Sequence, residues 1–188
     1  MEKKGIAVYC ASAPDIDKVY FDFARELGAL IAKAGLQVVN GGGRAGLMGA
    51  TIEGAVAAGG EVTGVLPRFM VEKGWDHKDL TRRIITETMH ERKLTIAEMS
   101  AGAIALPGGV GTLDELFEII TWRQLGLYDG SVVIANIDGF YDHLLAHLQG
   151  ACDRHFMRGR GLWSVATTPE EALRMALDRQ ELTILEKY

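Results

Sequence analysis

The stretch ALPGGVGTLDE, residues 105–115, joins an apolar run to a helical pattern. Three glycines and one proline fall within residues 107–113, and the segment LFEIITWRQLGL follows. Glycine lacks a Cβ, so the main chain of such a loop can approach a ligand closely. The stretch therefore predicts a strand, a ligand-binding turn and a helix, in that order.

Short apolar runs without polar alternation recur along the chain, as is typical of buried parallel strands. We expect strands at residues 5–10, 36–40, 61–66, 102–107 and 131–136, with a sixth candidate at 83–88. Helical patterns lie between them, at residues 15–34, 47–58, 88–101, 113–127, 141–156 and from 168 onward. This alternation predicts one α/β domain over residues 1–188, with a mostly parallel sheet flanked by helices. The least regular segment, 68–82, is expected to form a short helix and a loop near a site.

Composition limits the classes of partner. The chain has 188 residues, enough for one sizeable core, and its net charge of −5 gives no sign of a nucleic-acid-binding surface. Cys10 and Cys152 form no CxxC pair, which fits reduced thiols in a cytoplasmic protein. No signal-peptide pattern and no membrane-spanning apolar run is found, so we expect no membrane partner.

A first glycine loop, NGGGRAGLMG at residues 40–49, also follows an expected strand and opens a helix. Gly41, Gly43 and Gly46 match the G-x-G-x-x-G pattern of dinucleotide sites. Such sites need an acidic residue at the end of the next strand, where this chain has Pro67 and Arg68. We therefore discount NAD and keep a nucleoside monophosphate or a phosphosugar as the ligand class.

In the second loop, Gly108, Gly109 and Gly111 can offer backbone N–H groups to an anion at the helix N-terminus. Thr112 can add a hydroxyl donor, and no lysine follows as it would in a Walker A loop. Either loop alone could be a tight turn. Two such loops at the carboxyl ends of parallel strands favour a phosphate site where the strand order reverses.

Two charged positions stand near helix starts. Thr112 and Glu115 have the spacing of a capping box, and on sequence alone capping is the favoured role for Glu115. Arg92 and Lys93 follow the expected helix cap Thr88, and cations there cost about 0.3–1 kcal/mol against the helix dipole. These cations are therefore expected to serve a ligand, with solvated surface charge as the alternative.

The histidines do not predict a metal site. His143 and His147 have i,i+4 spacing, and Cys152 and His155 follow, but no third ligand with a supporting shell is identifiable. We interpret this segment as a partly exposed helix face. Trp122 is expected in the core or at an interface.

The motifs GGGRAGLMG, GVLP, MHERK, LPGGVGTLDE and TWRQLG resemble, in order and spacing, the LOG ("lonely guy") family over roughly residues 5–180. LOG proteins are cytokinin riboside 5′-monophosphate phosphoribohydrolases, often labelled lysine decarboxylase-like. The resemblance implies a Rossmann-like fold and a homodimer with active sites near the subunit interface. It also implies hydrolysis of AMP or N6-prenylated AMP to free base and ribose 5-phosphate, without a metal or an organic cofactor.

The resemblance places the catalytic roles on Arg92 and Glu115 and the phosphate-binding loop on residues 108–112. Further substrate contacts are expected at Lys93, Asp114, Thr121, Ser12, Gly42 and Met89. The decarboxylase label implies pyridoxal phosphate, but no residue pattern here marks a Schiff-base lysine with an acidic partner for the pyridine nitrogen.

One segment departs from the family pattern. Relatives read EKExAH where this chain has EKGWDH, so Gly74 replaces a glutamate near the substrate and Asp76 replaces a small residue. Either Glu72 or Asp76 takes over that role, or the specificity differs. Two non-catalytic alternatives stay open: a carrier that resembles the molybdenum-cofactor carrier proteins of this fold, and a nucleotide sensor.

Overall fold

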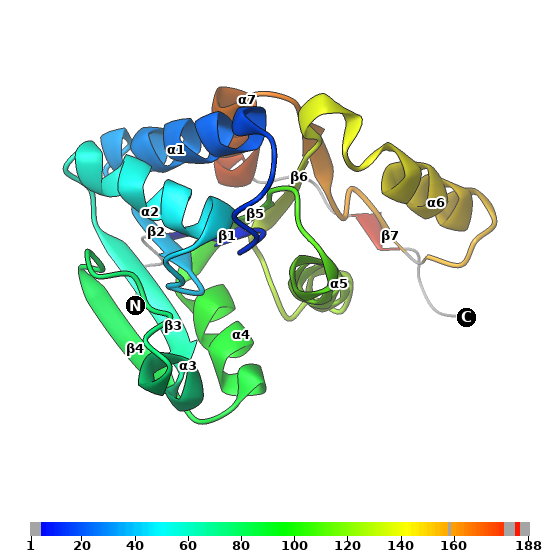
Figure 1. Ribbon diagram of the computed structural model, residues 1–188. Coiled ribbons are helices and arrows are strands. Elements are labelled where there is room, and N and C mark those ends of the chain that lie inside the picture. The colour runs from blue at the N-terminus through cyan, green and yellow to red at the C-terminus, as the bar shows by residue number, and fades with distance from the viewer. Residues whose placement is uncertain (1–4, 158, 179–182, 185–188) are drawn as a thin grey trace.

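The computed structural model describes residues 5–157, 159–178 and 183–184 (Figure 1). Seven strands form one parallel sheet in the order β4-β3-β2-β1-β5-β6-β8. Their bounds are β1 Gly5–Tyr9, β2 Gln37–Asn40, β3 Val62–Pro67, β4 Arg82–Thr86, β5 Ser100–Ala105, β6 Ser131–Ala135 and β8 Ser164–Ala166. A separate antiparallel pair joins β7 (Gly159–Arg160) and β9 (Thr183–Ile184).

Helices cover both faces of this sheet. They are α1 Lys18–Lys33, α2 Gly46–Ala57, α3 Arg68–Glu72, α4 Met89–Glu98, α5 Val110–Gln124, α6 Asp142–Asp153 and α7 Pro169–Leu177, with a 3₁₀ turn η1 at Ile137–Gly139. One face carries α1, α2 and α7, and the other carries α4, α5 and α6 (Figure 1). Among the described residues, no helix combines the length and apolarity needed to cross a bilayer.

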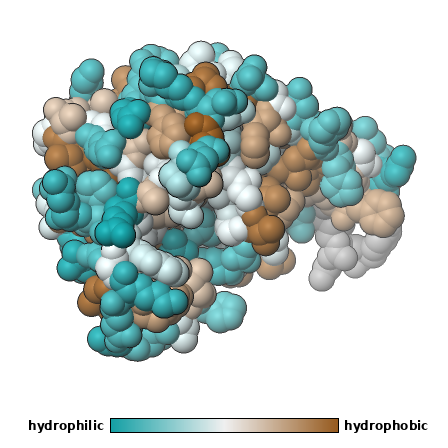
Figure 2. Space-filling view, viewed as in Figure 1, coloured by the Kyte–Doolittle hydropathy of each residue, from teal (hydrophilic) through white to brown (hydrophobic). Residues whose placement is uncertain are grey.

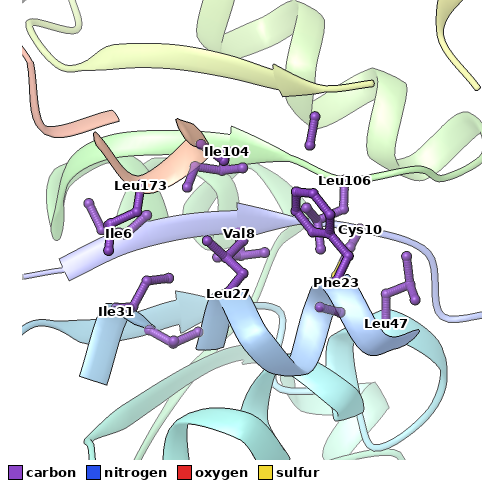
Figure 3. Close-up of a cluster of buried hydrophobic side chains, with 14 of the residues drawn as sticks. Ile6, Val8, Cys10, Phe23, Leu27, Ile31, Leu47, Ile104, Leu106 and Leu173 are labelled. Atoms are coloured by element: carbon purple, nitrogen blue, oxygen red, sulfur yellow. The ribbon is translucent and has the colours of Figure 1, made fainter. Parts of the chain in front are cut away.

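The core forms two layers because alternate residues of each strand face opposite sides of the sheet. Ile6 and Val8 of β1 pack against α1, where Leu27 and Ile31 are fully buried (Figure 3). The intervening Ala7 and Tyr9 belong to the second layer, beneath α4 and α5. Burying a large apolar side chain contributes about 1.5–3 kcal/mol, so both layers hold the central strands firmly.

The expected α/β fold is confirmed, and all six expected strands are present within a few residues of their expected bounds. β8 was not expected, because three residues carry too little pattern to reveal a strand. The expected capping box at Thr88 is also confirmed: its hydroxyl accepts the N–H of Glu91, and the Glu91 carboxylate accepts the N–H of Thr88.

The expected start of α5 is wrong. The helix begins at Val110 with Gly109 as its N-cap, so Thr112 lies inside the first turn. Glu115 is therefore one turn too far along to reach back to the cap, and the expected Thr112–Glu115 capping box does not form. Glu115 points instead to a partner on another helix, as described below.

Strand order reverses between β1 and β5. From β1 the chain moves through β2, β3 and β4 toward one edge, and the later strands β5, β6 and β8 extend toward the other edge. The loops that leave the carboxyl ends of β1 and β5 diverge at such a point and leave a crevice between them. The fold thus places the expected binding site beside the first residues of α5.

Helix α1 packs closely on α2 through Gly28, where a Cβ would lie 2.1 Å from the carbonyl oxygen of Thr51. We predict that Gly28→Ala lowers the free energy of unfolding by about 1–3 kcal/mol, because α2 would have to shift. Gly150→Ala in α6 is the matched control, because a Cβ there meets nothing within 4 Å. Urea denaturation should show the control unchanged or stabilised by about 0.5–1 kcal/mol; equal effects in both variants would contradict the packing argument.

Candidate active site

A cavity of about 680 Å³ opens at the carboxyl ends of the strands, at the expected crevice. It is lined by the β1–α1 loop, the β2–α2 glycine loop, the end of β3, α3 and the loop after it, α4 and the start of α5. Eight of the expected site residues line it: Ser12, Met89, Arg92, Gly109, Gly111, Thr112, Asp114 and Glu115. The two glycine loops thus share one cavity.

The central feature is a buried ion pair between α4 and α5. Arg92 Nη1 donates to Glu115 Oε1 at 2.8 Å, and the two residues are only 5% and 8% exposed. Arg92 Nε donates to the carbonyl oxygen of Val65 in β3 at 3.1 Å. The surface-charge alternative for Arg92 and the capping role for Glu115 are therefore both wrong. A buried charge pair costs desolvation energy, so this one calls for a functional explanation.

The first glycine loop makes room for this arginine. A Cβ on Gly41 would lie 2.0 Å from Arg92 Nη2, so any larger residue would displace the guanidinium. Gly42 and Gly46 adopt positive φ angles of 67° and 61°, which glycine tolerates without strain. The glycines of this loop therefore have structural reasons in the chain itself, apart from any ligand.

Backbone N–H groups of the first loop are already bonded within the protein. Gly42 N–H donates to the side chain of Asn40 at 2.8 Å, and Leu47 N–H donates to the carbonyl of Ala11 at 2.9 Å. Gly42 itself lies outside the cavity lining, because its backbone turns against Leu66. These bonds weaken the case for a dinucleotide phosphate at this loop.

The start of α5 is different. Its first helical hydrogen bond runs from Leu113 N–H to the carbonyl of Gly109, so the N–H groups of Val110, Gly111 and Thr112 have no acceptor within the helix. A Cβ on Gly109 or Gly111 would meet nothing within 4 Å, and both residues line the cavity. This end of the cavity has the geometry of an anion site.

Gly108 shapes the turn that precedes α5. A Cβ there would lie 2.1 Å from Thr112 Oγ1, so the residue must be glycine for the turn to close on Thr112. Two residues earlier, the carbonyl of Leu106 accepts a hydrogen bond from the hydroxyl of Tyr141 at 2.8 Å. Gly108 lies outside the cavity lining, one residue before the part that forms it.

Burial raises the pKa of the Glu115 carboxyl above its ordinary value of 4.5, and the Arg92 guanidinium opposes that rise. The carboxyl group is thus poorly solvated and holds its charge chiefly by pairing. Cys10 also lines the cavity, but burial raises the pKa of its thiol strongly, which keeps the thiol protonated. Cys10 therefore lacks the character of a nucleophile.

Lys93 lies behind the cavity lining. Its Nζ contacts Asp114 and Glu118 of α5, each at 3.1 Å, and the residue is 8% exposed. Burial lowers the pKa of Lys93, but its hydrogen bonds to the two carboxylates outweigh burial and raise it overall. Lys93 thereby fixes α4 to α5 and holds Asp114 at the cavity edge.

Thr121 also lies away from the cavity of its own chain. It is exposed on α5, and its hydroxyl donates to the carbonyl of Phe117 at 2.7 Å. Sequence reasoning missed several lining residues, namely Cys10, Arg44, Met48, Leu66, Met70 and Trp75. Met70 and Trp75 come from segment 68–82, which does form the expected short helix and a loop at the cavity.

The histidines of α6 do not assemble a metal centre. Within residues 5–157, 159–178 and 183–184, no three His, Cys, Asp or Glu side chains come together as a group that could hold a metal ion. His143 and His147 are both exposed. Trp122 is half-buried and packs against the layer beneath α5.

Comparison with known sequences places this site in a family. The family described as "Possible lysine decarboxylase" matches residues 48–176. The chain is 39% identical over 155 residues to cytokinin riboside 5′-monophosphate phosphoribohydrolase LOG5 of Arabidopsis thaliana, which is 82% of this chain and 68% of that protein. The chain belongs to the LOG family. A LOG-family relative from Rhodococcoides fascians, also named cytokinin riboside 5′-monophosphate phosphoribohydrolase, is 38% identical over 155 residues, or 82% of this chain and 78% of the relative.

Solved structures show the same fold as this LOG-family chain. The molybdenum cofactor binding protein of Rippkaea orientalis superposes with a TM-score of 0.70 at 24% identity, over 93% of this chain and 95% of that one. The Moco carrier protein of Chlamydomonas reinhardtii gives a TM-score of 0.70 at 25% identity, over 92% and 94%. The LOG-family chain therefore shares its architecture with proteins whose names denote cofactor binding.

For this LOG-family protein we predict that Arg92→Leu lowers the free energy of unfolding at pH 7 by about 3–5 kcal/mol, because Glu115 is left buried and unpaired. Without Arg92 the pKa of Glu115 rises further. A carboxyl group whose pKa is higher in the folded state than in the unfolded state favours folding at low pH, and this contribution is lost as pH rises through the folded-state pKa. The loss in urea denaturation should therefore shrink as pH falls toward 4.5.

Arg174→Leu is the control, because Arg174 pairs with Asp178 on the surface of α7 with its side chain 61% exposed. This variant should lose less than about 1 kcal/mol. A loss in Arg92→Leu that is the same at pH 7 and near pH 5 would show that packing, not charge, sets the role of Arg92.

Proposed function

We propose that this LOG-family protein hydrolyses the N-glycosidic bond of purine nucleoside 5′-monophosphates and releases the free base and ribose 5-phosphate. The observation that carries the proposal is the buried Arg92–Glu115 pair, which lines the same cavity as the α5 N-terminus. The names of the Arabidopsis and Rhodococcoides relatives support this reaction class. AMP and N6-prenylated AMP are the substrates we expect.

The phosphate binds at the start of α5. Its oxygens accept the N–H groups of Val110, Gly111 and Thr112, and the positive end of the helix dipole favours the charge. Binding at this end fixes the nucleotide in the cavity, so phosphate binding energy is used to position the sugar. A nucleoside without the phosphate is therefore a poor substrate.

Glu115 acts on the sugar. Breaking the bond builds positive charge at C1′, and a desolvated carboxylate stabilises that charge strongly. Oε1 accepts the bond from Arg92, which leaves Oε2 to orient a water molecule and accept its proton as the water oxygen bonds to C1′. The electron pair of the broken bond leaves with the base, which takes up a proton from solvent, and Glu115 then releases its proton to solvent.

Arg92 is not an acid in this scheme, because an arginine pKa exceeds about 12. It holds the Glu115 carboxylate in place and keeps it ionised, and it can offset negative charge on the departing base. Lys93, Asp114, Ser12 and Met89 are proposed to support the ligand around this pair. The scheme uses only side chains, backbone N–H groups and water.

A carrier function is the second candidate, because the solved structures of similar fold are named as molybdenum-cofactor binding or carrier proteins. Such a protein holds its ligand unchanged and has no need of a desolvated carboxylate beside the ligand. Burying the Arg92–Glu115 pair costs desolvation free energy, and a hydrolytic function explains this cost whereas a carrier function does not. Release of base from a nucleotide distinguishes the two functions.

We predict that the wild type releases adenine from AMP and the substituted base from N6-isopentenyl-AMP, as measured by chromatography. Glu115→Gln keeps the shape and an acceptor for Arg92 but removes the charge, so turnover should fall about a hundredfold or more. AMP binding by this variant, measured by calorimetry, should stay within a few-fold of the wild type. If both proteins bind nucleotide and neither releases base, the carrier function is correct.

We also propose that the protein is a homodimer with its active sites near the interface. Large apolar side chains are exposed on α4, on α5 and at the C-cap of α5: Leu94 is 47%, Phe117 39% and Leu125 63% exposed. Hydrophobic residues gather over the position of α5 in Figure 2. Thr121 lies between Phe117 and Leu125 on the same helix face, so its expected ligand contact is made to the neighbouring copy.

We predict that Leu125→Glu shifts the molar mass in light scattering from that of a dimer toward 20.4 kDa, because it places a charge in the apolar interface. Leu177→Glu on α7 is the control, since Leu177 is 45% exposed on the other face of the sheet and should leave the dimer intact. A wild type that is monomeric at micromolar concentration would remove this proposal.

The proposed compartment is the cytoplasm. Cys10 and Cys152 are both free, and Cys10 is buried, as expected for a protein that works where thiols stay reduced.

A further inference from the structure

The side of the cavity formed by β3 and α3 is apolar. Leu66 of β3, Met70 of α3 and Trp75 in the loop after α3 line it, and Met48 of α2 and Met89 of α4 complete it. The charged pair and the α5 N-terminus account for the sugar and phosphate, whereas the proposed function assigns nothing to Leu66, Met70, Trp75 or Met48. Thioether and indole groups form an adaptable apolar surface that suits a flat base or an alkyl group.

The sequence itself dictates where Trp75 lies. Helix α3 ends in a Schellman motif: Gly74 N–H donates to the carbonyl of Val71 at 2.9 Å, and Trp75 N–H donates to the carbonyl of Met70 at 3.1 Å. Gly74 adopts a φ of 65°, a conformation that a glutamate at this position would take only with strain. The indole then packs edge-on against Phe69, with ring centroids 6.5 Å apart, as the residue after such a cap commonly does.

The loop that carries Trp75 is fixed to the first glycine loop. Arg44 N–H donates to the carbonyl of Trp75 at 3.0 Å, and His77 N–H donates to the carbonyl of Gly42 at 2.8 Å. Between these bonds, Asp76 and Gly43 form an antiparallel bridge. The Asp76 carboxylate pairs with Arg83 of β4. The main chain at Trp75 is therefore held in place before any ligand arrives, as the support of a specificity-determining side chain must be.

These contacts also answer which residue replaces the missing glutamate. The Asp76 carboxylate is engaged by Arg83, and Glu72 is exposed and lies outside the cavity lining. Neither acid takes over a hydrogen bond to the base. Trp75 is the residue of this segment that lines the cavity, and it is 46% exposed. The Lys73 ammonium lies 4.8 Å from the centroid of its ring.

We propose that Trp75 is a specificity-determining residue, whose indole contacts the base and favours nucleotides with an apolar N6 substituent over AMP. The inference rests on the proposed function for its substrate class. A carboxylate would recognise the base by hydrogen bonds and reject analogues strongly, whereas an apolar wall ranks substrates by buried apolar surface. An isopentenyl group adds such surface, and the cavity of about 680 Å³ has room for it.

The test compares kcat/KM for N6-isopentenyl-AMP and for AMP in the wild type, Trp75→Ala and Trp75→Phe. We expect Trp75→Ala to lower the ratio of the two values about tenfold or more, and Trp75→Phe to retain most of it. Competitive inhibition by ribose 5-phosphate should be unchanged in both variants, because its phosphate and ribose contact α5 and the ion pair. A variant that failed to fold would lose this inhibition as well. The control therefore separates loss of the Trp75 contact from loss of the fold.

A second readout needs no turnover. Binding of the same two nucleotides to Glu115→Gln and to Glu115→Gln/Trp75→Ala is measured by calorimetry, and the indole should tighten the prenylated nucleotide more than AMP. If no nucleotide is hydrolysed but this preference persists, the proposed function fails and the Trp75 subsite stands. If the substrate ratio and the binding preference are both unchanged in Trp75→Ala, the Trp75 proposal is overturned whatever the activity.

Discussion

The buried ion pair between Arg92 and Glu115 is the constraint on which the rest of the site depends. Two charges at 5% and 8% exposure are stable only if every neighbour accommodates them. The carbonyl of Val65 in β3 accepts a hydrogen bond from Arg92 Nε, and Gly41 leaves space for Nη2. Helices α4 and α5 are tied together a second time by Lys93 with Asp114 and Glu118. The fold thus pays a desolvation cost at one point and surrounds it with compensating contacts from three elements.

The proposed phosphate-binding and catalytic groups lie on successive turns of one helix, α5. The N–H groups of the first turn of α5 have no acceptor within the helix, and in the proposed function they bind the phosphate while Glu115, one turn later, acts on the sugar. A chain with a net charge of −5 can bind an anion here because the helix end supplies a local positive potential. The distance between the N–H groups that would bind the phosphate and the Glu115 carboxylate is then set by the geometry of a rigid helix and not by the conformation of a loop.

Local patterns were enough to predict the sheet, most helices and the glycine loop of the site, because apolar runs and glycine clusters act over a few residues. They failed where the contacts of a side chain are made to a residue that is distant in sequence. Thr112-x-x-Glu115 has the spacing of a cap, yet Glu115 turns to Arg92, 23 residues away in sequence. Gly41 resembled a phosphate-binding glycine, and its actual neighbour is a guanidinium. Trp75 depends on both local and distant residues. The local sequence predicts the helix cap that precedes it, whereas its position at the cavity follows from hydrogen bonds to the β2–α2 loop.

A crystal structure of Glu115→Gln with AMP bound tests the proposed roles of α5 and Glu115 most directly. We expect the phosphate on the N–H groups of Val110, Gly111 and Thr112, with C1′ facing the side chain at position 115 and a water between them at about 3–3.5 Å from C1′. A phosphate bound at the first glycine loop, or a C1′ turned away from Arg92 and position 115, would contradict it.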